Sequence, residues 1–434
     1  MKLFKLLIAF TFYIQLGYAG NVISTTLEFL VDSDSLAQLE LGYHYGEQIY
    51  IYDSLSELKN TYSFSTDHQG VYYLLKNDSI YTHFFISNAC HNTSIVFGKD
   101  FTIMDGAKET LIYEQIRQNK IPASQLNDSL FINDISKGTG HLFKDYLALS
   151  QKPKSPDFNA LKDNFKSHSE LLKYQLEYYS LHYLDNVKFH NEELLYTPLF
   201  MDKVNTFVAK ISNQDPIKLS SNIDILLSKA RGNDIVFELI FKSLLNRYYN
   251  SKSKAEYEYM LLHLIENYIS KGIVTIEDPE LYNSLKREYA LRKKSSLYKK
   301  APNIDLLGYN YLDNNLYSIE NEIIIVYFYD YDCATCKKLT PMLVKIANKY
   351  EYLDVGLYAV CLGKTISKWN DYIKSAGLQS AYNLYDNTTQ QSTPLDYHIT
   401  NIPVIYVLDE NKQIIKKNIK LKELDSYLLS VAIN

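Results

Sequence analysis

A chain of 434 residues, 46% hydrophobic and 22% charged, has an ordinary globular composition and is too long for one hydrophobic core, so we expect two or three domains. Its formal net charge of −5 at pH 7 gives no reason to expect nucleic acid or an anionic membrane surface as a partner. Four cysteines are too few for a disulfide scaffold. The 40 tyrosines suit half-buried surfaces, where the ring packs against the protein and the hydroxyl stays in contact with water.

The N-terminus has the pattern of an export signal. Lys2 and Lys5 precede an apolar stretch, and a small-x-small motif at 17–19 forms a cleavage site. We expect a signal peptide over 1–19 that is cleaved after Ala19. A membrane anchor is the alternative, but the apolar stretch is short for a span. Export matters for the cysteines, because thiols outside the cytosol tend to oxidise.

Residues 20–106 have the pattern of a β-sandwich-like domain. Runs of alternating apolar and polar residues occupy 39–54, 70–86 and 93–105, and each run contains turn residues near its middle. Short strands with turn signals about every ten residues are typical of a small sandwich or barrel.

Residues 107–293 change to a helical period. Apolar side chains in 254–269 fall on one helical face, and Leu171, Leu172 and Leu176 have a similar spacing. Proline and glycine breakers divide this region into helices of ordinary length, and we expect six to eight of them. We interpret the apolar stripes as core and not as ligand sites.

Residues 294–434 alternate between strands and helices. Continuous apolar runs at 321–330 and 354–363 predict buried strands, each followed by a helix. Two strands and a last helix follow from residue 401 onward. The order βαβα and then ββα fits a sheet that is covered by helices.

Two of the four cysteines, Cys333 and Cys336, lie between the strand at 321–330 and the helix that follows it. At a helix N-terminus, the free N–H groups and the helix dipole stabilise a thiolate, which is the nucleophile in disulfide exchange. We predict that Cys333 attacks a substrate disulfide and that Cys336 resolves the mixed disulfide, so that the two form a redox-active disulfide.

Metal binding and a purely structural bridge stay open as alternative roles for this cysteine pair. A structural zinc site needs about four ligands, and no second CxxC motif is present. A copper site could combine the two thiolates with His398. A permanent structural disulfide closing so small a loop would add little stability. We expect no metal and no bound cofactor.

A proline far along the chain makes a family resemblance specific. Ile402-Pro403 opens a predicted strand, where a cis bond explains the proline. The segment FYDYDCATCKKLTP, with Pro341 five residues after the second cysteine, and the segment NIPVIYVLDENKQII resemble the thioredoxin superfamily, within it the exported TlpA-like and ResA-like branch. The resemblance implies that Pro403 is cis and faces the cysteine pair, that the backbone of Ile402 binds the substrate chain, and that Pro341 kinks the active-site helix.

The resemblance extends upstream. Residues 191–204 and 222–245 resemble the helical middle region of large exported thioredoxin-like proteins from Bacteroidetes-type bacteria, and the region before 106 resembles their N-terminal sandwich. The expected fold is therefore multidomain, with an N-terminal β-sandwich, an all-α middle region and a C-terminal α/β thioredoxin fold over 294–434.

The chain also departs from the family pattern. Tyr327 stands where classical thioredoxins carry a buried acid, and Leu339 stands where ResA-like proteins carry a glutamate. Asp332 replaces the tryptophan that usually precedes the first cysteine. These departures leave the exchange chemistry in place and leave its potential and rate open.

The remaining two cysteines are expected to have simpler roles. Cys361 ends a predicted strand and is expected to be a packed small hydrophobe. A Cys90–Cys361 bridge and a catalytic dyad of Cys90 with His91 are weaker alternatives.

Together, these patterns predict an exported thiol–disulfide oxidoreductase that reduces disulfides of periplasmic proteins. No GxGxxG motif follows a strand, so we expect the electrons to come from a membrane thiol donor. The alternative is an envelope binding or docking protein whose thioredoxin-like domain is structural or redox-inactive, because the region before residue 300 has no role in the first function.

Overall fold

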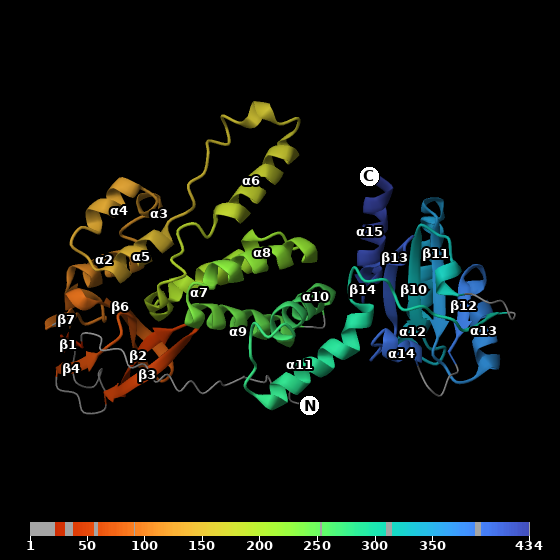
Figure 1. The fold of residues 1–434 in the computed structure, drawn as a ribbon, viewed down its shortest axis with the longest axis horizontal. Helices are drawn as coiled ribbons and strands as arrows, with labels where there is room; N and C mark the ends of the chain where they lie inside the picture. The colour runs from red at the N-terminus through yellow and green to blue at the C-terminus, as the bar shows by residue number, and fades with distance from the viewer. Residues whose placement is uncertain are drawn as a thin grey trace. The chain divides into compact units, whose positions relative to one another are not determined.

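The computed structural model describes residues 22–30, 38–55, 60–90, 92–251, 254–309, 315–386 and 392–433. The chain divides into two compact units, Met1–Ser243 and Leu244–Asn434 (Figure 1). The predicted signal peptide at 1–19 lies outside the described residues. Within the described ranges, no helix is both long enough and apolar enough to span a bilayer.

The first unit begins with two four-stranded sheets, in the orders β4-β1-β7-β8 and β3-β2-β5-β6. Buried residues of both sheets form one core cluster, in which Leu27, Leu41 and Phe84 are fully buried. Each of the three runs with central turn residues forms a pair of antiparallel strands, and the predicted sandwich is confirmed. The strands are β1 (Ile23–Phe29), β2 (Leu39–Tyr45), β3 (Gln48–Leu55), β4 (Thr61–Thr66), β5 (Gly70–Lys76), β6 (Ser79–Ile86), β7 (Thr93–Phe97) and β8 (Ile103–Asp105).

The middle of the chain is helical, as predicted. Its described part holds ten α-helices, so the expected number of six to eight was too low. The difference comes from α3 and α4, which are too short to show a helical period; the Asp128 side chain caps α4. The helices are α2 (Lys108–Arg117), α3 (Ala123–Leu126), α4 (Ser129–Ile135), α5 (His141–Ser150), α6 (His168–His182), α7 (Pro198–Thr206), α8 (Pro216–Ala230), α9 (Asp234–Asn250), α10 (Ala255–Leu264) and α11 (Pro279–Arg292).

The predicted core stripes are confirmed in one helix and wrong in another. The stripe in 254–269 is buried, including Met260 and Leu264. In α6, only Leu171 is buried, whereas Leu172 is 44% and Leu176 is 67% exposed. A period shows which residues share a face, but it does not show whether another element covers that face.

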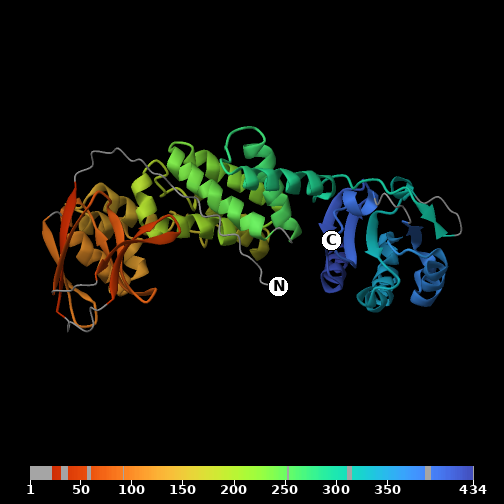
Figure 2. The ribbon, with the colours of Figure 1, turned by 90° about the horizontal axis from the view of Figure 1, so that it is seen from below.

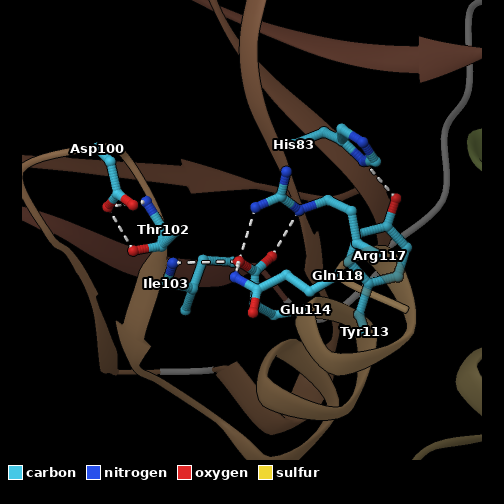
Figure 3. A network of polar contacts seen from close by, with 8 residues as sticks. All are labelled: His83, Asp100, Thr102, Ile103, Tyr113, Glu114, Arg117 and Gln118. Atoms are coloured by element: carbon cyan, nitrogen blue, oxygen red, sulfur yellow. Dashed lines mark hydrogen bonds and ion pairs between the residues drawn. The ribbon is translucent and has the colours of Figure 1, made fainter. Parts of the chain in front are cut away.

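A polar network ties α2 to the sheets of the first unit (Figure 3). The buried Glu114 carboxylate accepts two hydrogen bonds of 2.6 Å from Arg117 and one of 2.5 Å from Gln118, and the backbone N–H of Ile103 lies 3.5 Å away. The His83 ring of β6 bonds to the Tyr113 hydroxyl at 2.6 Å. These contacts join one helix to two strands.

The second unit is built on a six-stranded sheet in the order β14-β13-β10-β11-β12-β9. Central β10 is buried along its whole length and pairs with β11 in parallel and with β13 antiparallel. The predicted C-terminal strands and helices are present; the short β12 was not predicted. The elements are β9 (Leu307–Gly308), β10 (Ile323–Tyr329), α12 (Ala334–Lys349), β11 (Val355–Cys361), α13 (Ile366–Ala376), β12 (Tyr382–Tyr385), α14 (Ser392–Asp396), β13 (Val404–Asp409), β14 (Ile414–Lys417) and α15 (Leu421–Ile433).

Alternate residues of β10 face two different cores. Tyr327 and Tyr329 belong to the core under α12, α13 and α15, which lie on one side of the sheet in Figure 2. Val326 and Phe328 belong to the opposite core, which includes Tyr397 and residues of the segment before β10. The α/β architecture predicted for this part of the chain is confirmed.

Candidate active site

The cysteine pair lies where β10 passes into α12. Cys333 is the N-cap residue of this 16-residue helix, and its backbone is extended at φ −72° and ψ 118°. The Cys333 Sγ accepts a hydrogen bond of 3.2 Å from the backbone N–H of Cys336. Cys333 is half-buried, whereas Cys336 is fully buried. The structure therefore places Cys333 at the start of α12 and leaves it more exposed than Cys336.

The Cys333 sulfur lies at the N-terminus of α12. An N-cap side chain receives one of the otherwise unpaired N–H groups of the first helical turn, and the positive end of the helix dipole is adjacent. Both thiols are free in the structure, which corresponds to the reduced form of the pair.

Hydroxyl groups of three other residues form a buried network that reaches Cys336 at its backbone carbonyl. The Thr340 hydroxyl donates to the Cys336 carbonyl oxygen at 2.8 Å. The Tyr327 hydroxyl lies 2.9 Å from the Thr340 Oγ1, and the Tyr372 hydroxyl donates to that same atom at 2.8 Å. Burial, and after it the contact with Cys333, raises the pKa of the Cys336 thiol to about 12. The resolving thiol is thus protonated at neutral pH until something stabilises its charge.

The loop before Cys333 is fixed by a buried aromatic side chain. The Tyr331 hydroxyl accepts hydrogen bonds from the backbone N–H groups of Lys364 at 2.9 Å and Thr365 at 2.6 Å. The Tyr331 ring packs so closely on Gly363 that a Cβ added there would overlap the ring carbons. This contact joins the cysteine loop to the loop that follows β11.

Pro403 lies beside a cavity on the same unit. The Ile402–Pro403 bond is cis, as the sequence predicted, and it precedes β13. The cavity has a volume of about 700 Å³, and its lining includes Leu339 of α12 as well as Pro403. One wall carries Glu258 and Lys417, which pair at 2.6 Å and whose side chains are each 3% exposed.

Comparison with known proteins places this region in a family. Residues 321–414 match the model of a family described as thioredoxin-like. The C-terminal region is a thioredoxin-like domain. No curated protein sequence matches the chain.

Several solved structures are similar to the chain. A domain of a possible thiol-disulfide isomerase from Cytophaga hutchinsonii is 30% identical, with 32% of this chain and 93% of that chain covered and a TM-score of 0.30. A thioredoxin-like protein from Bacteroides caccae is 16% identical, with 64% and 97% covered and a TM-score of 0.44. A thiol:disulfide interchange protein from a Bacteroides species is 19% identical, with 32% and 93% covered and a TM-score of 0.30.

The structure also describes the other groups considered for the cysteines. Among the described residues, no group of three or more His, Cys, Asp or Glu side chains that could hold a metal ion is found. Cys361 is a fully buried free thiol and forms no bridge. The Cys90 side chain and His91 lie outside the part that the structure describes, so their dyad stays a prediction.

The sequence missed the hydroxyl network of the thioredoxin-like domain. Tyr327 was noted only as the place where a family acid is absent. Its partner Thr340 is on α12, and Tyr372, which also bonds to Thr340, is on α13. Thr340 lies four residues after Cys336, on the same helical face, and this spacing is the one signal that could have identified it.

Proposed function

We propose that this protein is an exported thiol–disulfide oxidoreductase that reduces disulfides of periplasmic proteins through Cys333 and Cys336. The observation that carries the proposal is the position of the Cys333 sulfur, which caps α12 and accepts the N–H of Cys336 at 3.2 Å. Cys333 is also the more accessible residue of the pair, as the attacking thiolate must be.

The proposed reaction has two exchange steps. The Cys333 thiolate attacks a substrate disulfide, forms a mixed disulfide and releases one substrate thiolate. Cys336 then loses its proton and attacks the Cys333 sulfur, so that the second substrate thiol leaves and an intramolecular disulfide forms. The substrate gains two electrons and the protein loses two. In this proposal the backbone at Ile402 and Pro403 holds the substrate chain, as the family resemblance implies.

The oxidised pair must be reduced again after each cycle. Two electrons from a dithiol suffice, and the proposed donor is a membrane thiol carrier that faces the periplasm. Export rests on the pattern at 1–19, with its basic start and its small-x-small motif.

A disulfide reduction assay tests the proposal. With insulin as substrate and dithiothreitol as reductant, we expect turnover by the wild type and none by Cys333→Ser. Cys361→Ala is the matched control, because it removes a buried thiol outside the pair and should keep turnover. Turnover that is unchanged in Cys333→Ser contradicts the proposal. The reduction potential of the pair then decides the direction, and a strongly oxidising value contradicts a reductase.

One observation favours the alternative of an envelope binding or docking protein. Leu172, Leu176 and Leu181 of α6 are 44%, 67% and 65% exposed, which is unusual for leucines of one helix. A wild type that lacks disulfide turnover but binds an envelope fraction, with binding lost in Leu172→Ser/Leu176→Ser, supports this second function.

A further inference from the structure

Two cavities of the second unit meet at the chain segment that follows β14. The first cavity, which Pro403 lines, has a volume of about 700 Å³, and the second has a volume of about 1030 Å³. The four residues 417–420 line both of them. The cavities are therefore adjacent, and together we call them the β14 groove. The groove begins at Pro403 and continues to the first turns of α10 and α15, where Ala255 and Glu423 line it.

The β14 groove is lined by more basic than acidic side chains. Its acidic residues are Glu256, Glu258 and Glu423. Its basic residues are twice as many, namely Lys254, Arg292, Lys416, Lys417, Lys420 and Lys422. This excess of positive charge contrasts with the formal net charge of −5 of the whole chain. A concave surface with one sign of charge focuses the electric field and attracts ligands of the opposite sign.

One part of the groove wall is electrically balanced within the protein. The buried Glu258 carboxylate of α10 pairs with Lys417 of β14 and with Arg292 of α11, at 2.6 Å in each case. Because both partners are also buried or nearly so, these ion pairs hold the two helices against the strand. The wall of the groove is thus fixed by contacts between α10, α11 and the thioredoxin-like domain.

The remaining positive charge is available to a ligand. Among the residues that the structure describes, no ion pair joins Lys416, Lys420 or Lys422 to a carboxylate. The Lys416 ammonium lies over the ring of Tyr427, which also lines the groove, 5.6 Å from the ring centroid. Lys420 and Lys422 are exposed. A negatively charged ligand can therefore pair with these lysines without first displacing an acidic side chain.

The groove also lies at the N-terminus of α15. This helix of 13 residues begins at Leu421, which lines the first cavity. The partial positive charge of a helix N-terminus adds to the charge of the lysines. Glu423 offsets part of this charge, because its carboxylate accepts the backbone N–H of Lys420 at 3.1 Å. The two lysines that flank Leu421 keep the sign of the site positive.

We propose that the β14 groove binds an acidic segment of the substrate chain, next to the disulfide that Cys333 attacks. The inference rests on the proposed function, because it names the class of substrate for that reaction. Since Pro403 lines the first cavity, a substrate backbone held at Pro403 can continue into the groove. Partly buried apolar side chains of Leu339, Val404 and Ile419 lie between the charged ones and can pack on the aliphatic parts of such a segment.

A polypeptide fits this site better than an anionic membrane does. The positive charge lies inside a groove, which an extended chain can enter and a flat bilayer cannot, and the net negative charge of the whole chain opposes binding to an anionic surface. The proposal also assigns a function to α10 and α11, because Glu258 and Arg292 fix the wall that the substrate would meet.

The test is the reduction of three peptides that differ only in the residues beside one disulfide. These residues are glutamates in the first peptide, serines in the second and lysines in the third. For the wild type at low ionic strength, we expect kcat/KM to be about tenfold higher for the glutamate peptide than for the serine peptide, and lowest for the lysine peptide. The difference should shrink in about 0.5 M salt, because salt screens exposed charges.

Lys420→Glu/Lys422→Glu tests whether the groove causes this preference, which we define as the ratio of kcat/KM for the glutamate peptide to that for the serine peptide. We expect the ratio to fall to about one or below. A fault in folding lowers both values and leaves their ratio unchanged. Lys286→Glu/Lys374→Glu is the matched control, because it makes the same change of net charge on exposed lysines of α11 and α13 outside the groove. This control should keep the wild-type ratio.

Equal kcat/KM for the glutamate and serine peptides in the wild type overturns the inference, and so does an equal fall of the ratio in both double variants. Peptide binding separates this failure from a failure of the proposed function. Fluorescence anisotropy measures it with a labelled glutamate peptide in which serines replace the cysteines. Binding that is lost in Lys420→Glu/Lys422→Glu, without turnover of any peptide, supports the groove and contradicts the proposed function. Binding of phosphatidylglycerol vesicles but not of the peptide overturns the inference.

Discussion

The two units of this protein each bury a polar network, and the networks differ in what they surround. In the first unit, the Glu114 carboxylate is fully engaged by Arg117, Gln118 and a backbone N–H, and it ties a helix to a strand (Figure 3). In the second unit, the hydroxyls of Tyr327 and Tyr372 meet at Thr340, which bonds to the backbone carbonyl of Cys336 beside its buried thiol. The first network balances a buried charge permanently, whereas the second lies beside a group that is neutral at rest and, in the proposed reaction, becomes charged.

The two networks show that burial has different consequences for a charged group and for a neutral one. A buried ion pair is costly to break, so it holds two elements in one arrangement. A buried neutral thiol with hydroxyl neighbours is stable as it is, and its neighbours become important only when it ionises. Variants in the first unit should therefore change stability, and variants in the second should change rates.

The largest expected effect is on chemistry. Cys333→Ser should lower disulfide exchange by about a thousandfold or more, because loss of a nucleophile removes the whole route. Single-turnover thiol kinetics measure this, and the free energy of unfolding should stay close to the wild-type value. A Cys333→Ser variant that loses much stability but keeps the wild-type exchange rate would contradict this contrast between the two units.

The second expected effect is on stability. Glu114→Ala leaves the Arg117 guanidinium, with a side chain only 25% exposed, without its carboxylate, and should destabilise α2 by about 3 kcal/mol. Hydrogen exchange of the α2 amides in the full chain measures this change, and the rate of disulfide turnover should equal that of the wild type. Asp134→Ala is the control: its ion pair with Lys137 is exposed, so we expect no measurable change.

A smaller effect depends on pH. Burial, with a further contribution from the Arg117 charge, lowers the pKa of His83 to about 4. Between pH 6.5 and pH 4 the unfolded chain binds more protons than the folded one, so stability is full above pH 6.5 and falls as the pH drops. After allowance for partial exposure, the loss at pH 4 should be about 2 kcal/mol. In His83→Gln, the stability should no longer fall by this amount between pH 6.5 and pH 4. A pH profile of stability identical to that of the wild type contradicts the assignment.

The smallest effect is expected on α6. Leu176 is 67% exposed, so Leu176→Ser should change the free energy of unfolding by less than about 0.5 kcal/mol. Leu171→Ser is the contrast, because Leu171 is buried and its loss should destabilise the helix. Equal effects in thermal unfolding would mean that the exposed leucines of α6 are covered in solution.

Much of the fold of the second unit follows from local sequence. The continuous apolar run of β10 predicts a central strand, and the cysteines after it begin a helix. By contrast, β12 has only four residues, which is too short for a period to be visible. In the first unit, β1 buries Thr25 between apolar residues, so its sequence does not alternate although its burial does.

The residues of the candidate site also differ in whether the sequence reveals them. Cys333 and Pro403 could be found because their spacing and context are local or familiar. The hydroxyl network that includes Tyr327 could not be found, because Tyr372 lies 32 residues from its partner Thr340 and meets it only after α13 packs on the sheet. Because the chain has 40 tyrosines, a tyrosine at one position does not by itself indicate a functional role.

The contact between Tyr331 and Gly363 has a consequence for every encounter with a substrate. Its two backbone hydrogen bonds and its close ring packing fix the loop that leads into Cys333. Conformational freedom in that loop is lost once, when the domain folds, and not again at each binding event. A bulkier residue at 363 would return this freedom to the loop, and the entropy of ordering it would then oppose every docking of a disulfide onto the sulfur.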